Sequence, residues 1–438
     1  MSKFIIADID LTYIHKNAGK KTCNYLANKQ NYEPGNKNEN KSNNNADNKA
    51  FNKVFCGLYE DNRFYEVNFS EYISNDESAK ADSIGNIYVG KVKDVVKNIN
   101  TAFVEYKKGC IGYLSLEDNK HIIFLNKKNT DKVCEGDDII VQISKAAVKT
   151  KFPVLTSNIS LTGRNVVINI GKSGIGFSGK IKNVGFKNHI QAELDDILDK
   201  LNVKFGIVIR TNAENAKEDE IKKELNELLS EWEHIKEIAM MRKCYTLLKS
   251  EDALYIKMIK NLYANETDEI ITDNEEIYYE LKDKFNEKYN IRLYADTLLP
   301  LYKLYSIEKV VEEVCSKKVW LKSGAYLVIE PTEAMTVIDV NTGKCIKGKR
   351  LSDTIYNVNI EAAKEIAYQM RLRNMSGIIM VDFINMENKE YQDKLIEYLK
   401  KIVLKDRIRT NVVDITKLNI VEITRKKVER PVYEQIYQ

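Results

Sequence analysis

Two aspartates in the C-terminal part of the chain each follow a short apolar run and open a polar turn. They are Asp339 in MTVIDVNTGK and Asp382 in IIMVDFINM. In an open α/β sheet, ligand sites gather beyond the ends of the strands. Two carboxylates about 4 Å apart repel by about 4 kcal/mol at an effective dielectric constant near 20, and a divalent cation between them reverses the sign. The pair therefore indicates a metal site, with a simple capping role for each aspartate as the alternative.

The surroundings of the pair favour a hard cation and a phosphodiester substrate. The motifs offer only oxygen ligands, which suits Mg²⁺ first and Mn²⁺ second. Asn341 adds an amide on the same side of the strand as Asp339 if the strand continues. The turn that follows is basic and contains no acid, and its charged residues are Lys344, Lys347, Lys349 and Arg350. The cation would bind the reacting phosphate, and the lysines would bind the neighbouring phosphates. The alternative is that this basic segment is only a solvated loop.

Histidine and cysteine offer no comparable site. The four histidines are far apart in sequence, and none of the seven cysteines forms a C-x-x-C pair, so no zinc is expected. The cysteines are predicted to be buried free thiols of a cytoplasmic protein. No stretch of about 20 residues lacks charge, so no transmembrane helix is expected. Asp8 and Asp10 interrupt the apolar start of the chain, which argues against a signal peptide.

The first half of the chain is predicted to be rich in strands. The 438 residues are 43% apolar and 30% charged, the composition of a soluble protein with several packed domains. A strand over 3–9 and a hairpin over 53–69 flank residues 17–48, of which 11 of 32 are Asn. We interpret this Asn-rich segment as a disordered insertion. Short strands over 84–145 predict a small antiparallel barrel, and strand-like runs continue over 153–213.

The second half changes character. Residues 214–291 have apolar residues at helical spacing, and residues 299–430 alternate short β runs with helices. The alternation predicts an α/β domain, and this domain carries both aspartates.

The predicted barrel has aromatic residues that single-stranded nucleic acid could use. They are Tyr88, Phe103 and Tyr113, and basic residues follow the barrel at Lys145, Lys149 and Lys151. OB-type barrels bind single strands through such aromatic faces and basic rims. Each aromatic taken alone is more often a core residue, but the set with its lysines favours nucleic acid.

Taken together, these segments resemble the ribonuclease E/G family of bacterial endoribonucleases. The resemblance runs from about residue 84 to 430, and the hairpin at 53–69 also fits. It rests on GNIYVGKV, AFVEY and GYL in the barrel, on LTGRNVVI and GIVIRT after it, and on three long blocks: KVWLKSGAYLVIEPTEAMTVIDVNTGK, NIEAAKEIAYQMRLRNMSGIIMVDFINM and DRIRTNVVDITKLNIVEITRKKV.

The resemblance implies an α/β multidomain architecture. An RNase H-like domain would contain an inserted OB-type, S1-like β-barrel and a 5′-sensor domain, and a DNase I-like α/β catalytic domain would follow. The implied boundaries are 1–83 for the first RNase H-like part, 84–146 for the barrel, 147–244 for the sensor, 245–298 for the second RNase H-like part, 299–430 for the catalytic domain and 431–438 for a tail.

The resemblance also implies site residues. The family's metal-binding aspartates fall on Asp339 and Asp382, and its catalytic asparagine falls on Asn341. The pocket for a 5′-monophosphate falls on Arg210 and Thr211. Further implied RNA contacts are Val167 beside the terminal base, Phe103 and Tyr113 in the barrel, and Arg425.

Some family features are missing from the sequence. No C-P-x-C zinc link follows Cys345, so a zinc-bridged dimer is not expected, although a homo-oligomer could form through other surfaces. Asn385 stands where the family has a second acid, and Ser178 to Lys180 replace a pair of arginines. The sequence thus predicts a Mg²⁺-dependent endoribonuclease for single-stranded RNA, with a preference for 5′-monophosphorylated ends, in rRNA processing and mRNA decay. A catalytically weak RNA-binding protein of the same fold and a DNA-directed nuclease or binder are the alternatives.

Overall fold

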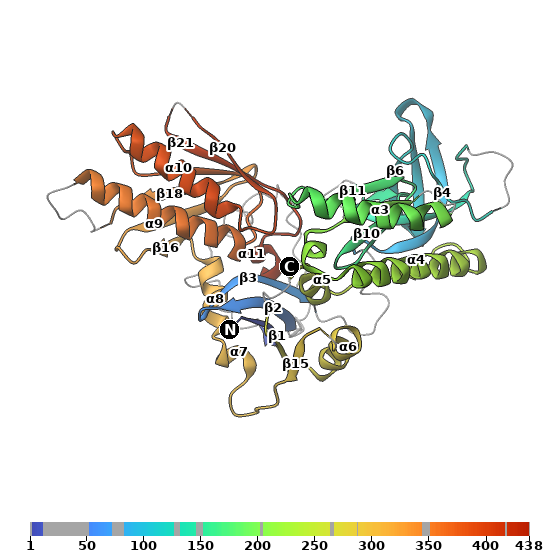
Figure 1. Ribbon diagram of the computed structural model, residues 1–438, viewed down its shortest axis with the longest axis horizontal. Coiled ribbons are helices and arrows are strands. Elements are labelled where there is room, and N and C mark those ends of the chain that lie inside the picture. The colour runs from blue at the N-terminus through green and yellow to red at the C-terminus, as the bar shows by residue number, and fades with distance from the viewer. Residues whose placement is uncertain are drawn as a thin grey trace, which may run out of the picture. The chain divides into compact units, whose positions relative to one another are not determined.

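The computed structural model describes residues 2–11, 52–71, 83–126, 132–145, 152–201, 205–262, 267–286, 288–343, 351–416 and 418–437. The chain forms two compact units (Figure 1): residues 1–72 together with 267–438 form unit 1, and residues 73–266 form unit 2. Unit 2 is therefore an insertion in the sequence of unit 1. No helix within the described ranges is long and apolar enough to cross a membrane. The Asn-rich segment, 17–48, lies outside the described residues.

The first sheet of unit 1 is assembled from both sides of the insertion. Its order is β15-β14-β1-β2-β3, made of β1 (Lys3–Asp10), β2 (Asn52–Glu60), β3 (Arg63–Glu71), β14 (Glu269–Thr272) and β15 (Asn290–Leu293). The predicted hairpin is confirmed, and Asp61 and Asn62 take φ of 48° and 61°, as a type I′ turn requires. β1 runs parallel to β14, with Lys3 opposite Glu269. The likeness of this sheet to RNase H stays a prediction.

Short helices complete this part of unit 1. They are α6 (Glu275–Phe285), α7 (Leu301–Leu304), α8 (Ile307–Cys315) and α11 (Val432–Tyr437). Residues of α7, α8 and α11 share one core with β1, β2 and β3. Glu66 of β3 accepts hydrogen bonds from Arg371 at 2.8 Å and Arg407 at 2.6 Å. Burial raises the pKa of the Glu66 carboxyl, but the charges of Arg407 and Arg371 outweigh it and hold that pKa below its ordinary value.

Unit 2 contains the predicted barrel. Five strands close it: β4 (Ile87–Val96), β5 (Thr101–Lys107), β6 (Cys110–Ser115), β7 (Asp138–Lys145) and β8 (Val154–Thr156). β4 pairs with both β5 and β7, and β8 lies between β6 and β7, so the ring is complete. A 3₁₀ turn, η1 (Lys97–Ile99), joins β4 to β5.

Two expected boundaries in unit 2 differ from the structure. The barrel does not end at residue 146, because β8 is needed to close it. The second part of the N-terminal domain does not begin at residue 245, because β13 (Leu247–Lys249) pairs with β4. Helix α5 (Leu254–Asn261) also belongs to unit 2.

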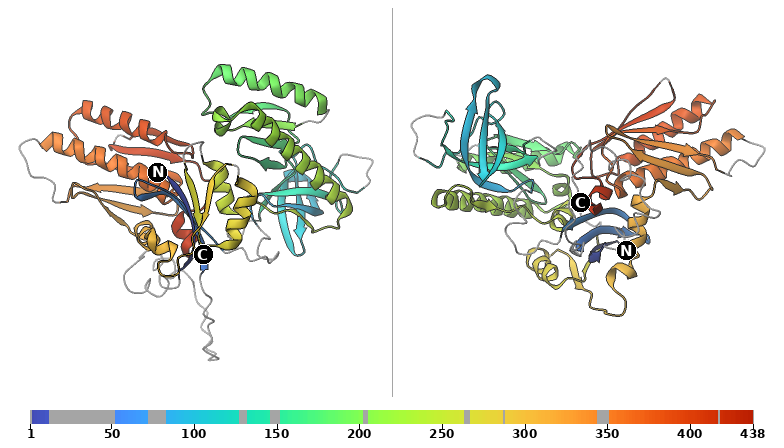
Figure 2. Two further views of the ribbon diagram at one scale, coloured as in Figure 1. Left: turned by 60° about the horizontal axis from the view of Figure 1, so that its bottom comes forward. Right: turned by 180° about the vertical axis from the view of Figure 1, so that it is seen from behind.

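The remaining sheet of unit 2 lies in the range expected for the sensor, a role that stays a prediction, and is called the sensor sheet below. Its order is β11-β12-β10-β9, made of β9 (Ser160–Thr162), β10 (Val166–Ile170), β11 (Gly174–Phe177) and β12 (Phe205–Ile209). Helix α4 (Glu218–Met241) packs against β10, and α3 (Val184–Leu201) against β11 (Figure 2). Helix α3 was not expected, since the sequence suggested strands throughout 153–213. Phe186, Ile190 and Leu194 do follow one another at intervals of four residues, a helical spacing that the strand-like runs on either side obscured.

The second sheet of unit 1 carries the aspartates. Its order is β16-β17-β18-β19-β21-β20, made of β16 (Lys318–Trp320), β17 (Tyr326–Pro331), β18 (Met335–Asn341), β19 (Gly377–Asp382), β20 (Thr410–Ile415) and β21 (Ile420–Arg425). Helices α9 (Leu351–Leu372) and α10 (Lys389–Val403) lie side by side (Figure 1) and share a core with one face of this sheet. The α/β domain is thus confirmed, and its likeness to DNase I stays a prediction.

Candidate active site

Asp339 and Asp382 are direct partners in the sheet. β18 and β19 are parallel neighbours, and their pairing places Asp339 opposite Asp382. The flanking Ile338, Val340 and Val381 are buried against the helices, whereas both aspartates are exposed. Adjacent strands lie about 4.8 Å apart, so two in-register aspartates on one face are direct neighbours. The pattern of alternate burial therefore creates the carboxylate pair that the sequence predicted.

Asn341 lies beside this pair, two residues after Asp339 on the same face. Its Nδ2 donates a hydrogen bond to Oδ2 of Asp339 at 2.6 Å. Gly343 follows with φ of 57°, and a Cβ atom there would collide with the carbonyl oxygen of Gly324. Only glycine fits this turn without strain, so Gly343 fixes where the chain turns just after Asn341.

Asn359 of α9 is a supporting residue that sequence reasoning missed. It is fully buried. Its Nδ2 donates to the carbonyl of Ile384 at 2.8 Å, and its Oδ1 accepts from the backbone N–H of Ile384 at 3.1 Å. The turn after Asp382 is thereby fixed to the helix. The sequence did contain a signal for this role, because Asn359 lies on the apolar face of the helix formed by Val358, Ala362 and Ala363.

The residues present suit a hard divalent cation. Two carboxylates and an amide supply oxygen ligands. In the described ranges no group of three or more His, Cys, Asp or Glu side chains could hold a metal ion, so the protein would provide few of the ligands. A cation at Asp339 and Asp382 would keep several water or substrate oxygens as ligands, which is usual for Mg²⁺. Lys344 and the rest of the basic turn lie outside the described residues, so their role stays a prediction.

The predicted 5′-sensor residues come together in unit 2. Val167 of β10 lies opposite Val208 of β12, and Arg210 follows Val208 by two residues, on the same side of the strand. The Oγ1 of Thr211 lies 2.9 Å from the Oγ of Ser178. Val167, Arg210 and Thr211 are all half-buried. The structure therefore pairs two hydroxyls at the ends of β11 and β12, and Arg210 precedes one of them in the chain.

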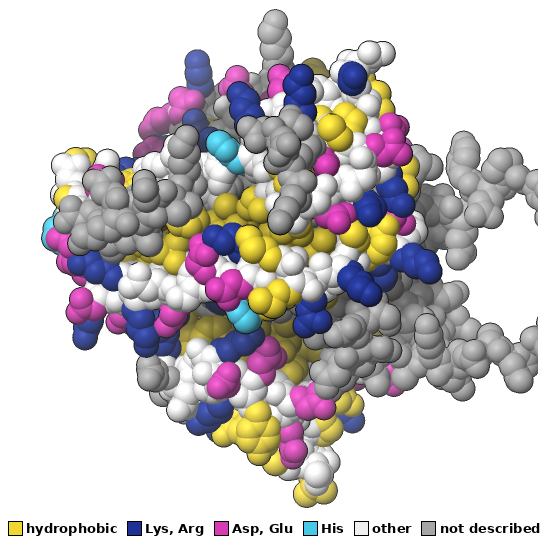
Figure 3. Space-filling view, turned by 90° about the vertical axis from the view of Figure 1, so that its right-hand side faces the viewer, with side chains coloured by type: hydrophobic (Ala, Val, Ile, Leu, Met, Phe, Trp, Pro, Cys, Tyr) yellow, Lys and Arg dark blue, Asp and Glu magenta, His cyan; other side chains and the backbone are white. Residues whose placement is uncertain are grey.

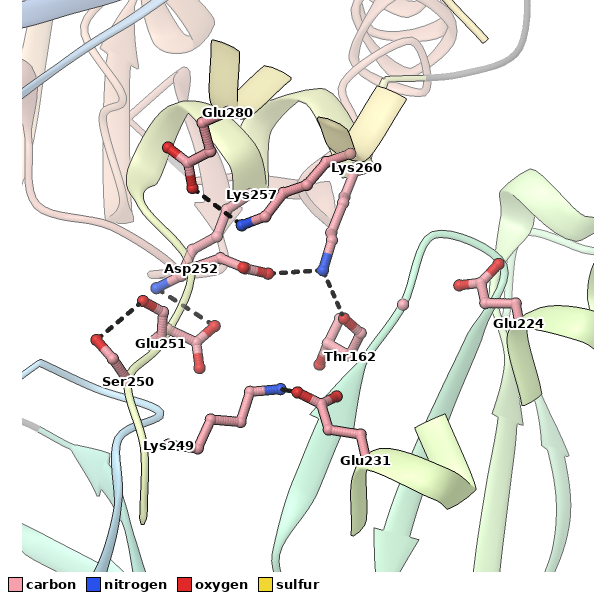
Figure 4. Close-up of polar contacts among 12 residues, drawn as sticks. Thr162, Glu224, Glu231, Lys249, Ser250, Glu251, Asp252, Lys257, Lys260 and Glu280 are labelled. Atoms are coloured by element: carbon pink, nitrogen blue, oxygen red, sulfur yellow. Dashed lines mark hydrogen bonds and ion pairs between the residues drawn. The ribbon is translucent and has the colours of Figure 1, made fainter. Parts of the chain in front are cut away.

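Arg210 is anchored by neighbouring segments. Its guanidinium donates to the carbonyl of Gly163 at 2.6 Å and to the side chain of Asn261 at the end of α5. Figure 4 shows how α5 is itself attached: Lys260 reaches between Asp252, at 2.6 Å, and the carbonyl of Thr162, at 3.5 Å. α5 therefore holds Arg210 in a fixed orientation, although no sequence signal connected the two.

The barrel presents an aromatic cluster, as predicted in part. Phe103 and Tyr113 are half-buried cross-strand partners with ring centroids 6.4 Å apart. Phe152, which the sequence did not single out, is 53% exposed and lies 5.8 Å from Phe103. Tyr88 is 2% exposed, so the expectation that it forms part of the surface is wrong. Phe103, Tyr113 and Phe152 are called the barrel aromatic cluster below.

The basic rim of the barrel is only partly described. Lys145 at the end of β7 is exposed, and Lys149 and Lys151 lie outside the described residues. On the side of the molecule shown in Figure 3, Lys and Arg side chains are interspersed with Asp and Glu side chains. Charge alone therefore does not mark one binding face on that side.

Arg425 is a structural residue, which corrects the expectation that it contacts RNA. Its side chain is 2% exposed and donates to Oδ2 of Asp406 at 2.7 Å. It also donates to Oδ1 of Asn374 at 2.8 Å and to the carbonyl of Met375 at 2.9 Å. A guanidinium enclosed in this way is not available to a ligand at the surface. The neighbouring Lys426 and Lys427 are exposed.

A cavity of about 290 Å³ in unit 1 does not coincide with this site. It is lined by Met335 and Gly377, among others, which are the first residues of β18 and β19. Asp339 and Asp382 lie at the opposite ends of the two strands. Both aspartates are instead exposed on the sheet face turned away from α9 and α10.

Comparison with known proteins decides the family. A model of the family described as "Ribonuclease E/G family" matches residues 160–428, which include the sensor sheet and the complete second sheet of unit 1. The chain belongs to the ribonuclease E/G family. Ribonuclease G of Haemophilus influenzae is 32% identical in an alignment of 377 residues that covers 83% of this chain and 76% of that relative. Ribonuclease G of Escherichia coli strain K12 is 31% identical, with 80% and 74% covered. Ribonuclease E of Nostoc sp. is 32% identical over 80% of this chain and 52% of its own length.

Membership of the ribonuclease E/G family confirms the resemblance found in the sequence. The matched range contains Asp339, Asn341, Asp382, Arg210 and Thr211. Most of the barrel precedes the range that the family model matches. The alignments with the ribonuclease G relatives are longer and include the barrel.

Proposed function

We propose that this chain is an endoribonuclease that cleaves single-stranded RNA with Mg²⁺ held by Asp339 and Asp382. Its place in the ribonuclease E/G family supports the reaction class. The observation that carries the metal assignment is the in-register carboxylate pair on the open sheet face. Family resemblance further favours a DNase I-like catalytic part, an RNase H-like N-terminal part and a role in rRNA processing and mRNA decay in the cytoplasm.

The protein side of the mechanism follows from the geometry. Asp339 and Asp382 would hold the cation, which would supply positive charge beside the scissile phosphate and would make a water molecule more acidic. The amide of Asn341 orients the carboxylate of Asp339 through the 2.6 Å hydrogen bond. Asn359 keeps the turn after Asp382 in place. In this proposal the chain's own residues mainly position groups and balance charge.

One experiment tests the proposed function. Matched single-stranded RNA and DNA oligonucleotides are incubated with the protein, with Mg²⁺ and with EDTA. We expect internal cleavage of the RNA alone, and only with Mg²⁺. Cleavage of DNA at the same rate would support the DNA-directed alternative, and tight RNA binding without cleavage would support the RNA-binding alternative.

The sensor residues predict that RNA with a 5′-monophosphate is cleaved faster than RNA with a 5′-hydroxyl. A hydrogen bond to a charged group contributes about 1.5–3 kcal/mol, so one such bond from Arg210 or Thr211 to a 5′-monophosphate corresponds to about a ten- to a hundredfold gain in cleavage over a 5′-hydroxyl. Cleavage rates of one oligonucleotide with either end measure the effect. Equal rates for both ends would show that the sensor is inactive.

Variants identify the residues of this sensor. Arg210→Ala and Thr211→Val should each reduce the preference while the 5′-hydroxyl substrate is cleaved as before. Thr211→Val is the milder test, because Arg210 also anchors Asn261. Lys172→Ala, which removes an exposed lysine of unit 2, is the matched control and should keep the full preference.

The barrel aromatic cluster predicts a stacking contribution to RNA affinity. Base stacking on an aromatic side chain contributes about 1–3 kcal/mol, so Phe103→Ala should weaken binding of single-stranded RNA by that amount. Fluorescence anisotropy below the melting temperature measures it, with denaturant unfolding alongside. Met241→Ala, at a residue 85% exposed, is the control. A loss of stability with unchanged affinity would identify Phe103 as a core residue only.

A further inference from the structure

The open face of the second sheet carries more than the catalytic residues. The pairing of β16 with β17, of β17 with β18 and of β18 with β19 sets Lys318, Val328, Asp339 and Asp382 in one line across four strands. A second line on the same face contains Trp320, Tyr326 and Asn341. The alternating residues Val319, Leu327 and Ile329 are buried in the core with α9, so both lines lie on the face opposite the helices.

At one end of these lines stand two aromatic rings and an ammonium group. The rings of Trp320 and Tyr326 are tilted against each other with centroids 5.2 Å apart. The Nζ of Lys318 lies 4.0 Å from the Trp320 ring and 3.5 Å from the Tyr326 ring. Trp320 is nevertheless 64% exposed. A large apolar ring that is held by two neighbours and still presents most of its area to water is typical of a binding surface rather than a core.

We infer that Trp320 is a stacking platform for the base of a nucleotide next to the scissile phosphate, with Lys318 beside that nucleotide's own phosphate. The inference rests on the proposed function. β16 lies two strands from β18, about 10 Å at the usual strand spacing, which is within reach of a neighbouring nucleotide of a strand whose phosphate is at Asp339 and Asp382. Stacking on an aromatic ring combined with a nearby cation is how proteins bind single strands without reading sequence.

The platform acts on the substrate differently from the carboxylates. It contacts a base and no reacting atom, so Trp320 and Lys318 are positioning residues. Their contribution should depend on the presence of a base at one position of the substrate, whereas loss of Asp339 or Asp382 should affect every substrate alike. This difference makes the inference separable from the proposed function.

Fluorescence provides a direct readout, since the sequence has two tryptophans. Trp232 is 2% exposed in the core of unit 2, and Trp320 is 64% exposed. A short single-stranded RNA is titrated into protein carrying Asp382→Asn, which is expected to slow turnover about a thousandfold. We expect saturable quenching of the emission, and its loss when Trp320→Phe is added. Saturation of binding by anisotropy with no change in Trp320 emission would overturn the inference.

A substrate series provides the second readout. Single abasic sites are placed in turn around the cleavage position of one oligonucleotide. In the wild-type protein one such site should lower cleavage about five- to a hundredfold, as expected for loss of one stacked base. Trp320→Ala should lower cleavage of the intact oligonucleotide by a similar factor and should be insensitive to that abasic site, because the two changes remove the same contact. Trp320→Phe should retain most of the activity.

Controls separate the possible failures. Tyr279→Ala removes a tyrosine of unit 1 that is 66% exposed and should behave like the wild type. If the wild-type protein does not cleave RNA at all, the proposed function fails. If it cleaves, and the abasic series is the same with and without Trp320, the inference alone fails. A change of sedimentation coefficient in Trp320→Ala without any effect on RNA would instead assign the surface to contact between copies of the chain.

Discussion

Asp339→Asn and Asp382→Asn should each lower RNA cleavage roughly a thousandfold, because removing a ligand of the cation takes away about 4 kcal/mol of transition-state stabilisation. Both side chains are exposed on the sheet face, so neither change is expected to disturb folding. Single-turnover cleavage with saturating protein measures the chemical step, and anisotropy measures RNA affinity in parallel. We expect the rate to fall and the affinity to stay close to that of the wild type.

The matched control for this pair is Asp393→Asn, an exposed aspartate on α10, the helix that packs against the opposite face of the same sheet. It keeps the change of charge but lies away from the paired carboxylates, and it should retain near wild-type cleavage. A variant of Asp339 or Asp382 that kept more than about a tenth of the wild-type rate, far above the expected loss, would remove that residue from the catalytic assignment.

The second large effect concerns stability. Removing one partner of a buried ion pair costs about 3–5 kcal/mol, because the other charge is left without compensation in the interior. Arg425 and Asp406 have side-chain exposures of 2% and 5%, so Arg425→Met should lower the free energy of unfolding by that amount. Replacing both partners, with Arg425→Met and Asp406→Leu together, should restore much of the loss. Urea unfolding followed by circular dichroism measures both.

Lys426→Met is the control, because Lys426 is the next residue and is exposed. It should leave stability within about 0.5 kcal/mol of the wild type. The structural assignment of Arg425 would be wrong if Arg425→Met were as stable as the wild type and bound RNA more weakly.

The fate of Arg425 illustrates what a local pattern can and cannot predict. The basic run TRKK resembled an exposed patch, yet its Arg425 follows Val421 and Ile423 at intervals of two residues on the buried side of β21. Strand periodicity therefore placed Arg425 inward, but its buried acceptors Asp406 and Asn374 come from distant segments. No sequence pattern revealed that such acceptors existed, and without them an inward arginine is improbable.

The position of Tyr88 was also mispredicted, because strand β4 is buried on both of its faces. β4 contributes Tyr88 and Val92 to the barrel core, while Ile87 and Val89 of the same strand pack with the sensor sheet. A strand covered on both sides has no polar face, so alternation could not tell whether Tyr88 was inside. Phe152 was missed because it is far from Phe103 in the sequence, and only the closed barrel brings the two rings together.

The predictions that succeeded depended on short-range order. The hairpin at 53–69 and the alternation around β18 and β19 are local periodicities that the folded chain preserves. The in-register pairing of Asp339 with Asp382 was only hinted at by two apolar runs ending in Asp. The register itself is set by packing of Ile338 and Val381 on the helices, which requires the tertiary structure.

The parallel pairing of β1 with β14 has a consequence for synthesis of the protein on the ribosome. Ser2 and Asp268, which join the two strands by a hydrogen bond, are 266 positions apart, and at about 5–20 residues per second this interval lasts roughly 13–50 s. During that time one edge of β1, with Phe4, Ile5 and Ile6 that end up fully buried, has no partner strand. An exposed apolar edge invites pairing with other chains. We therefore expect nascent chains that pause between unit 2 and β14 to aggregate, or to bind chaperones, more than chains that have completed β14.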